Sequence, residues 1–178
     1  MNLDTLIKEI TPLYNSYKEN AKIIKGTDAI KIMWEIGDLI KKYLKNNNIA
    51  PHTLYRQIYG KSEGTKNIEQ KSYLTREFLS RSFRIRNIFT SIEEIEEKLP
   101  NLQRFITFRE AMPFFDNPKY KLLGEDMENL LKILNSENSR KALHQVEELQ
   151  KTYIGIKNPR NQRLKELEKD KSTFVDFY

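Results

Sequence analysis

Apolar side chains recur at three- and four-residue steps along most of the chain, a pattern that predicts amphipathic helices. The first run extends from Leu3 to Ile24 and the second from Asp28 to Lys45, with Gly37 near the middle of the second. A glycine inside a helix costs about 1 kcal/mol relative to alanine, so we expect a neighbouring element to approach closely there. Thr27 or Asp28 is expected to cap the second helix.

Turn residues divide the next part of the sequence into shorter elements. Pro51 suits the first position of a helix that ends at Gly60. A polar stretch over 61–72 is interpreted as a solvated loop or a small hairpin. A further amphipathic helix is predicted over 73–89, where the sequence reads YLTREFLSRSFRIRNIF.

The remaining elements follow from the same signals. Ser91 and Glu94 have the spacing of a capping box, so a helix is expected to begin there and to close at Pro100. We expect helices over 102–112, 122–134 and 139–153, and an aromatic loop over 113–122. The pattern weakens after Tyr153, where we expect a linker, a short exposed helix over 163–171 and an apolar tail.

Together these elements predict a mostly α protein. The expected fold is a compact multi-helix domain over 1–135 that contains a helix-turn-helix-like unit, with a small wing or hairpin as an option. Residues 136–178 are expected to form a C-terminal helix and a basic tail, packed on the first domain or on a partner. The six glycines and six prolines among 178 residues give little punctuation for a many-stranded sheet, which also favours helices.

The charge balance indicates which class of partner the protein can bind. The chain carries 31 Lys and Arg against 25 Asp and Glu, a net charge of +6. Residues 49–90 hold eight of the basic and three of the acidic residues, so the excess is concentrated around the helix at 73–89. A basic region of this kind permits contact with a polyanion such as DNA or RNA.

The lack of cysteine limits the kinds of site that the protein can form and gives no indication of secretion. Without cysteine there is no disulfide, no cysteine zinc site and no thiolate catalysis. The amino terminus has no signal-peptide core, and no apolar run is long enough to span a bilayer. We therefore expect a soluble, cytoplasmic protein that makes no membrane contact.

The helix at 73–89 separates its side chains onto two faces. On a helical projection four large apolar residues share one sector: Leu74, Phe78, Ile85 and Phe89. The opposite sector holds Arg76, Ser80, Arg84 and Asn87, with Arg81 and Arg86 on the flanks. Arginine, serine and asparagine are side chains that read base edges and phosphates, so this helix is a candidate recognition helix.

The same pattern is also that of an ordinary surface helix, since arginine is a good helix former. Two features favour nucleic acid: Glu77 is the sole carboxylate between Lys71 and Thr90, and a short helix precedes this one, as a helix-turn-helix requires. The predicted contact residues are Arg56, Lys61, Lys66, Lys71, Arg76, Ser80, Arg81, Arg84, Arg86 and Asn87. Three nearby tyrosines either stack on bases or pack between helices: Tyr55, Tyr59 and Tyr73.

These residues carry a family resemblance. The stretch MWEIGDLIKKYL, a short helix ending in YG, and then LTREFLSRSFRIRNIF resembles the amino-terminal helical domain of the bacterial YhcG-like proteins. The resemblance covers about residues 3–135 in pattern and is closest at Trp34, Glu35, Ile36 and Gly37. It implies a DNA-binding module of restriction-like or mobile-element biology. In that family a PD-(D/E)XK-type nuclease domain follows; none is recognisable within these 178 residues, so we expect a nuclease or complex supplied in trans.

Residues suited to catalysis are scarce. His52 and His144 lie in different expected helices without a second ligand at metal spacing, and no glycine-rich phosphate loop is present. We therefore expect a non-enzymatic protein with no metal and no cofactor. Two alternatives stay open: an RNA-binding module, and a protein-interaction subunit or inhibitor that docks through the aromatic loop at 113–120 and the tail at 172–178.

Overall fold

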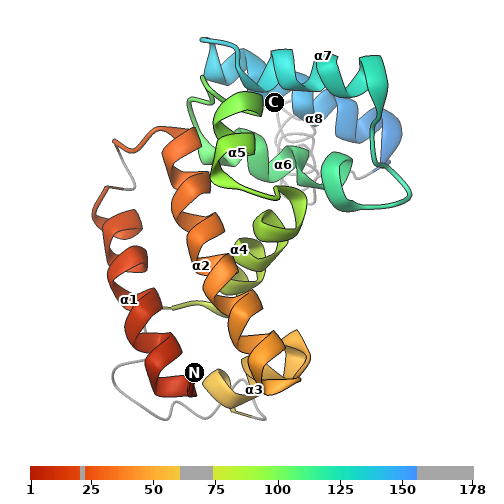
Figure 1. Ribbon diagram of the computed structural model, residues 1–178. Helices are drawn as coiled ribbons and strands as arrows, with labels where there is room; N and C mark the ends of the chain where they lie inside the picture. Colours follow the sequence, from red (N-terminus) through yellow and green to blue (C-terminus); the bar gives the residue numbers. More distant parts are fainter. Residues whose placement is uncertain (21–22, 61–73, 156–178) are drawn as a thin grey trace, which may run out of the picture.

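The computed structural model describes residues 1–20, 23–60 and 74–155, and every regular element in that part is a helix (Figure 1). The helices are α1 (Leu3–Glu19), α2 (Gly26–Asn47), α3 (Pro51–Tyr59), α4 (Arg76–Ile88), α5 (Ile92–Lys98), α6 (Phe105–Asp116), α7 (Gly124–Leu134) and α8 (Ser139–Tyr153). The expected mostly α, multi-helix fold is therefore confirmed.

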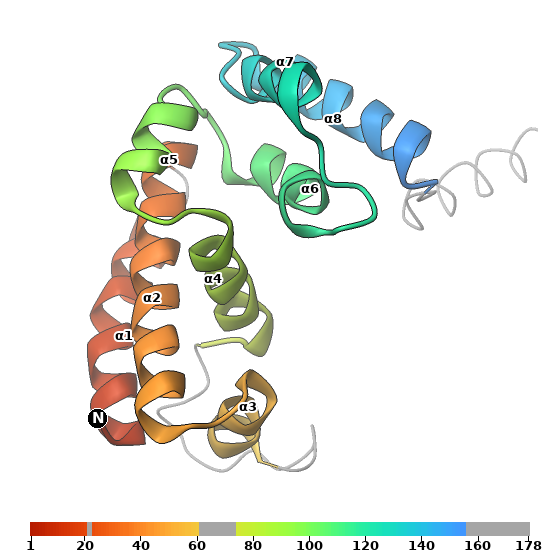
Figure 2. The same ribbon diagram turned by 45° about the vertical axis from the view of Figure 1, so that its right-hand side comes forward.

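Three of the longer helices, α1, α2 and α4, form a bundle with α2 in its middle (Figure 1). The short helix α3 lies at one end of this bundle, and α5 lies beside α2 at the other end (Figure 2). Helix α6 packs against α2 and α4, α8 packs on α6, and α7 packs on α8 (Figure 1). One continuous apolar core runs from α1 to α8.

Helix α2 begins at Gly26, two residues earlier than the sequence predicted, and neither Thr27 nor Asp28 caps it. The carbonyl of Gln103 accepts the Gly26 N–H and that of Leu102 accepts the Thr27 N–H, so a distant segment of the chain satisfies the first turn. Thr27 is buried, and its hydroxyl donates to the Leu99 carbonyl at 2.5 Å. A tertiary contact thus replaces the local side-chain cap.

Helix α1 ends at Glu19 rather than at Ile24. The side-chain amide of Asn20 donates to the Ser16 carbonyl at 2.9 Å, and the backbone N–H of Asn20 donates to the same carbonyl. Asn20 is the C-cap of the helix, which therefore ends five residues before the apolar pattern does.

Helix α6 corrects the prediction of a loop over 113–122, because it continues through Pro113 to Asp116. Proline lacks the N–H that an interior helical position donates, and this would normally end the helix. Here Phe114 and Phe115 are both buried in the core, and their packing keeps the last turn helical. Docking through 113–120, part of the alternative interaction module, would therefore not use these two phenylalanines, because both are buried.

The connection between α3 and α4 extends from Gly60 to Thr75, far longer than the turn of about three to four residues in a helix-turn-helix. The wing or hairpin expected over 61–72 falls outside the described residues, as do the exposed helix at 163–171 and the tail at 172–178. In the described part of the chain, no helix has both the length and the apolar character needed to cross a membrane.

Candidate nucleic-acid interface

Helix α4, the candidate recognition helix, is fixed in the bundle on two sides. Thr75 caps its first turn by accepting the Phe78 N–H at 3.1 Å. The four apolar residues predicted to share one face, Leu74, Phe78, Ile85 and Phe89, are all buried as expected. The ring of Phe78 packs edge-on against Tyr14 of α1, with the ring centroids 4.8 Å apart.

A second side of α4 is buried against α2, and of this contact the sequence indicated only the α2 side, through Gly37. The expected close approach at Gly37 is confirmed: a Cβ atom there would lie 2.2 Å from the carbonyl oxygen of Ser82. Ser82 is fully buried, and its hydroxyl donates to the Phe78 carbonyl at 2.9 Å. A small residue facing a small residue lets the two backbones touch, so α4 has less free surface than its apolar pattern alone indicates.

Arg86 lies in this α2 contact. Its Nε donates to Asp38 Oδ1 at 2.7 Å, and its guanidinium stacks over the ring of Trp34, 4.6 Å from the centroid. The indole N–H of Trp34 donates to the Phe89 carbonyl at 2.9 Å, which fixes the ring. The side chain of Arg86 is only 18% exposed, so it joins α4 to α2 instead of facing solvent.

Asp38 is shared between two cations. Lys42 contacts its second carboxylate oxygen at 2.9 Å while Arg86 holds the first. Partial burial raises the pKa of Asp38, but the hydrogen bonds from Lys42 and Arg86 outweigh burial and hold that pKa below its ordinary value. The carboxylate therefore stays ionised, and it keeps Arg86 in place.

Arg84 points away from the apolar face, as predicted, but it meets α6. Its Nε donates to Asp116 Oδ2 at 2.7 Å and its Nη2 to Oδ1 at 2.9 Å, the bidentate geometry of a strong arginine–carboxylate pair. Asp116 ends the helix that was expected to stop before Pro113. The sequence pattern could not bring this carboxylate to α4, because it placed the residue in a loop.

Arg81 pairs with Glu77 one turn earlier on α4. Three of the four arginines of the helix are thus in ion pairs, although Glu77 is the sole carboxylate between Lys71 and Thr90 in the sequence. One carboxylate comes from the helix itself, and the others come from α2 and α6. The sequence around α4 contains only one of these carboxylates, that of Glu77.

The first turn of α4 is held to α3 by tyrosines. Tyr59 donates its hydroxyl to the Leu74 carbonyl at 2.6 Å, and burial raises the pKa of Tyr59 well above its ordinary value. Burial also raises the pKa of Tyr55, whose hydroxyl is hydrogen-bonded to Ser80. Tyr55 and Tyr59 therefore pack between helices. Tyr73 falls outside the described residues.

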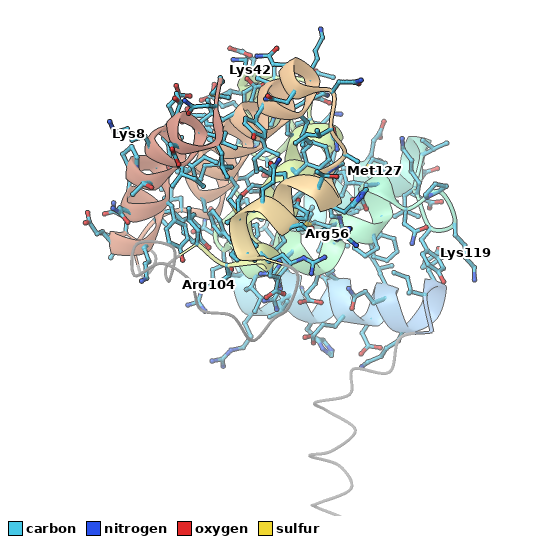
Figure 3. The ribbon with its side chains drawn as sticks, turned by 90° about the horizontal axis from the view of Figure 1, so that it is seen from below. Lys8, Lys42, Arg56, Arg104, Lys119 and Met127 are labelled. Carbon is cyan, nitrogen blue, oxygen red and sulfur yellow. The ribbon has the colours of Figure 1, made fainter. Side chains whose placement is uncertain are left out.

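Among the arginines of α4, Arg76 has no carboxylate partner in the described part of the chain; its guanidinium lies 5.7 Å from the centroid of the Tyr55 ring and is exposed. Arg56, on α3, is exposed as well (Figure 3). Asn87 is exposed in the last turn of α4. The predicted contact residues Lys61, Lys66 and Lys71 lie outside the described residues.

Sequence reasoning missed two exposed lysines at the same end. Lys41 and Lys45 lie one helical turn apart near the end of α2, just before α3. From Leu39 to Gly60 the sequence has four basic residues and no carboxylate. This run spans the end of one expected helix and the whole of the next, so neither helix alone stood out as basic. We call Lys41, Lys45, Arg56 and Arg76 the basic end. The first half of helix α1 adds Asp4, Lys8 and Glu9 near this end, a net charge of −1.

The opposite end of the protein is acidic. Helix α5 carries four glutamates and one lysine, and α7 opens with Glu125, Asp126 and Glu128. Both helices lie away from α3 (Figures 1 and 2). The charge of the described chain is therefore polarised along the bundle.

No grouping of three or more His, Asp and Glu side chains suited to a metal ion occurs within residues 1–20, 23–60 and 74–155. No protein-family model matches the chain, and the comparisons with curated proteins and with solved structures give no match either.

Proposed function

We propose that this protein is a nucleic-acid-binding module that contacts duplex DNA through its basic end. The observation that carries the proposal is the run from Leu39 to Gly60, which has four basic residues and no carboxylate and which folds into one end of the bundle. Lys41, Lys45 and Arg56 are exposed there, and Arg76 joins them from α4. Such a group of unneutralised cations releases counterions from a phosphate backbone on binding.

The rest of the charge distribution supports this assignment. The carboxylates of α5 and α7 lie at the far end, so they do not oppose a polyanion at α3. Three further lysines and two glutamates belong to the 61–72 segment that follows α3 in the sequence. The binding module acts without catalysis of its own, and the chemistry of the system comes from a nuclease or larger complex supplied in trans.

The direct test is a titration of fluorescent 20-base-pair duplex DNA at several salt concentrations. Four phosphate contacts give a slope of log affinity against log salt of about −3.6, so affinity falls roughly 150-fold between 50 and 200 mM salt. The quadruple variant Lys41→Gln/Lys45→Gln/Arg56→Gln/Arg76→Gln should lose most of this affinity and most of the slope. Duplex RNA and single strands are titrated in parallel to separate the RNA alternative.

A matched control removes the same charge elsewhere. Lys121, Lys132, Arg140 and Lys141 are exposed on the α6–α7 connection, α7 and α8, away from α3. Their replacement by glutamine lowers the net charge by four as well. If the control loses as much affinity as the first variant, binding follows net charge and not the basic end. Absence of binding to every nucleic acid at 50 mM salt would overturn the proposed function.

A further inference from the structure

The arginines of α4 best suited to read bases are already engaged within the protein. Base recognition by arginine uses a free guanidinium edge that donates two parallel hydrogen bonds to guanine. The Nε and Nη2 edge of Arg84 is taken by Asp116, and the Nε of Arg86 donates to Asp38 while its guanidinium stacks on the Trp34 ring. Each of these two guanidiniums is therefore fixed in position by a carboxylate of the fold, with its Nε donor already used.

The side chains left over on α4 are too far apart for one reading surface. Arg76 and Asn87 are exposed but stand eleven residues apart, about 16 Å along the helix axis. Ser80, between them, is hydrogen-bonded to Tyr55. A recognition helix instead brings about three to four side chains to neighbouring base pairs.

The free cations have the distribution that suits phosphates. Lys41 and Lys45 on α2, Arg56 on α3 and Arg76 on α4 come from three different helices. Two of them are lysines, whose compact charge contacts phosphate oxygens without a fixed hydrogen-bond geometry. Phosphate contacts position a protein on a duplex and carry no sequence information directly.

Resting on the proposed function, we infer that the basic end recognises the phosphate backbone of duplex DNA and does not read its sequence. Asp116 and Asp38 hold the arginines of α4 in the fold, so α4 supports the interface as a framework and does not enter the major groove. The ligand class is duplex DNA of any base composition.

The experiment compares sequences directly. The full chain is incubated with a pool of 20-base-pair duplexes randomised at every position, bound duplexes are recovered over several rounds, and the enriched pool is sequenced. Individual duplexes of different base composition are then titrated at one salt concentration. We expect no enriched motif and affinities that agree within about threefold, because specific recognition normally gives a preference of at least about a thousandfold.

Three variants assign the result to residues. Arg84→Ala and Asn87→Ala should leave the affinity for every duplex within about twofold of the unchanged protein, whereas Arg56→Ala should weaken binding to all duplexes alike and reduce the salt slope by about 0.9. Thermal unfolding checks that each variant is folded. An enriched motif with a preference of a hundredfold or more, lost in Arg84→Ala or Asn87→Ala, would overturn this inference and leave the proposed function standing. No binding to any duplex would overturn both.

Discussion

Asp116 on α6 accepts both hydrogen bonds of the Arg84 fork on α4, from Nε at 2.7 Å and from Nη2 at 2.9 Å. The pair joins the three-helix bundle to the layer formed by α6, α7 and α8. The pair also bears on the role of α4, because an unpaired Arg84 would be a leading candidate for contact with a base. Its two roles, in stability and in binding, can be tested separately.

The contribution of this pair to stability should be modest. Arg84 is 44% exposed and Asp116 21% exposed, so solvent screens much of their attraction. We expect a coupling free energy of about 0.5–1 kcal/mol, at the upper end for an exposed pair because the geometry is bidentate. A double-mutant cycle with Arg84→Ala, Asp116→Ala and the double variant, followed by urea unfolding, measures it. A coupling indistinguishable from zero would show that the pair does not hold α6 to α4.

Substitution of Gly37 by alanine should be strongly destabilising, although alanine is the better helix former by about 1 kcal/mol. The new Cβ atom would lie 2.2 Å from the backbone carbonyl oxygen of Ser82, and a backbone atom cannot move aside without shifting α4. We expect a loss of about 2–4 kcal/mol in the free energy of unfolding. Lys41→Ala, at an exposed position of the same helix, is the control and should change stability by less than about 0.5 kcal/mol. A Gly37→Ala protein as stable as the unchanged one would contradict the close approach.

The carboxylate of Asp38 should make part of the stability depend on pH. Burial raises its pKa, but the hydrogen bonds from Lys42 and Arg86 prevail and hold that pKa below the ordinary value of 3.8. A carboxyl with a lower pKa in the folded state stabilises fully above the unfolded value, and this contribution disappears as the pH falls through the folded value. Asp38→Asn should therefore be less stable than the unchanged protein at pH 7, and the difference should shrink as the pH falls below 3.8. Urea unfolding across this range measures the difference, and a gap that stays constant with pH would contradict the assignment.

The sequence predicted the buried face of α4 because that information is local. Leu74, Phe78, Ile85 and Phe89 recur at helical spacing, and apolar side chains at that spacing are buried almost regardless of what they meet. Gly37 also indicated a close contact between helices, since a glycine in the middle of a helix destabilises it unless such a contact requires it. What it touches could not be derived from its neighbours in the sequence.

The partners of the arginines could not be predicted for the same reason. Asp38 is 48 residues from Arg86, and Asp116 is 32 residues from Arg84. Only the packing of α2 and α6 against α4 brings these carboxylates into reach. Pro113 added to the difficulty, because a proline normally ends a helix and the burial of Phe114 and Phe115 that overrides it is a tertiary effect. The Ser91 cap, a purely local feature, was confirmed: Ser91 accepts the Glu94 N–H at 3.3 Å.

Release of Arg84 should strengthen DNA binding without creating sequence preference. In Asp116→Asn the neutral amide no longer holds the guanidinium as an ion pair, and Arg84 lies about 12 Å along α4 from Arg76, on the outer side of the helix. A phosphate can then take the place of the carboxylate. We expect an affinity about three- to tenfold higher at 50 mM salt and a salt slope steeper by about 0.9, the signature of one added phosphate contact.

The control for this prediction is Asp126→Asn, which makes the same change of charge at an exposed position of α7, far from α3. It should raise affinity by less than twofold and leave the salt slope unchanged. Equal gains in the two variants would mean that only net charge matters. A gain in Asp116→Asn confined to particular duplex sequences would mean that the freed arginine reads bases, and that the carboxylate at the end of α6 restrains a recognition helix.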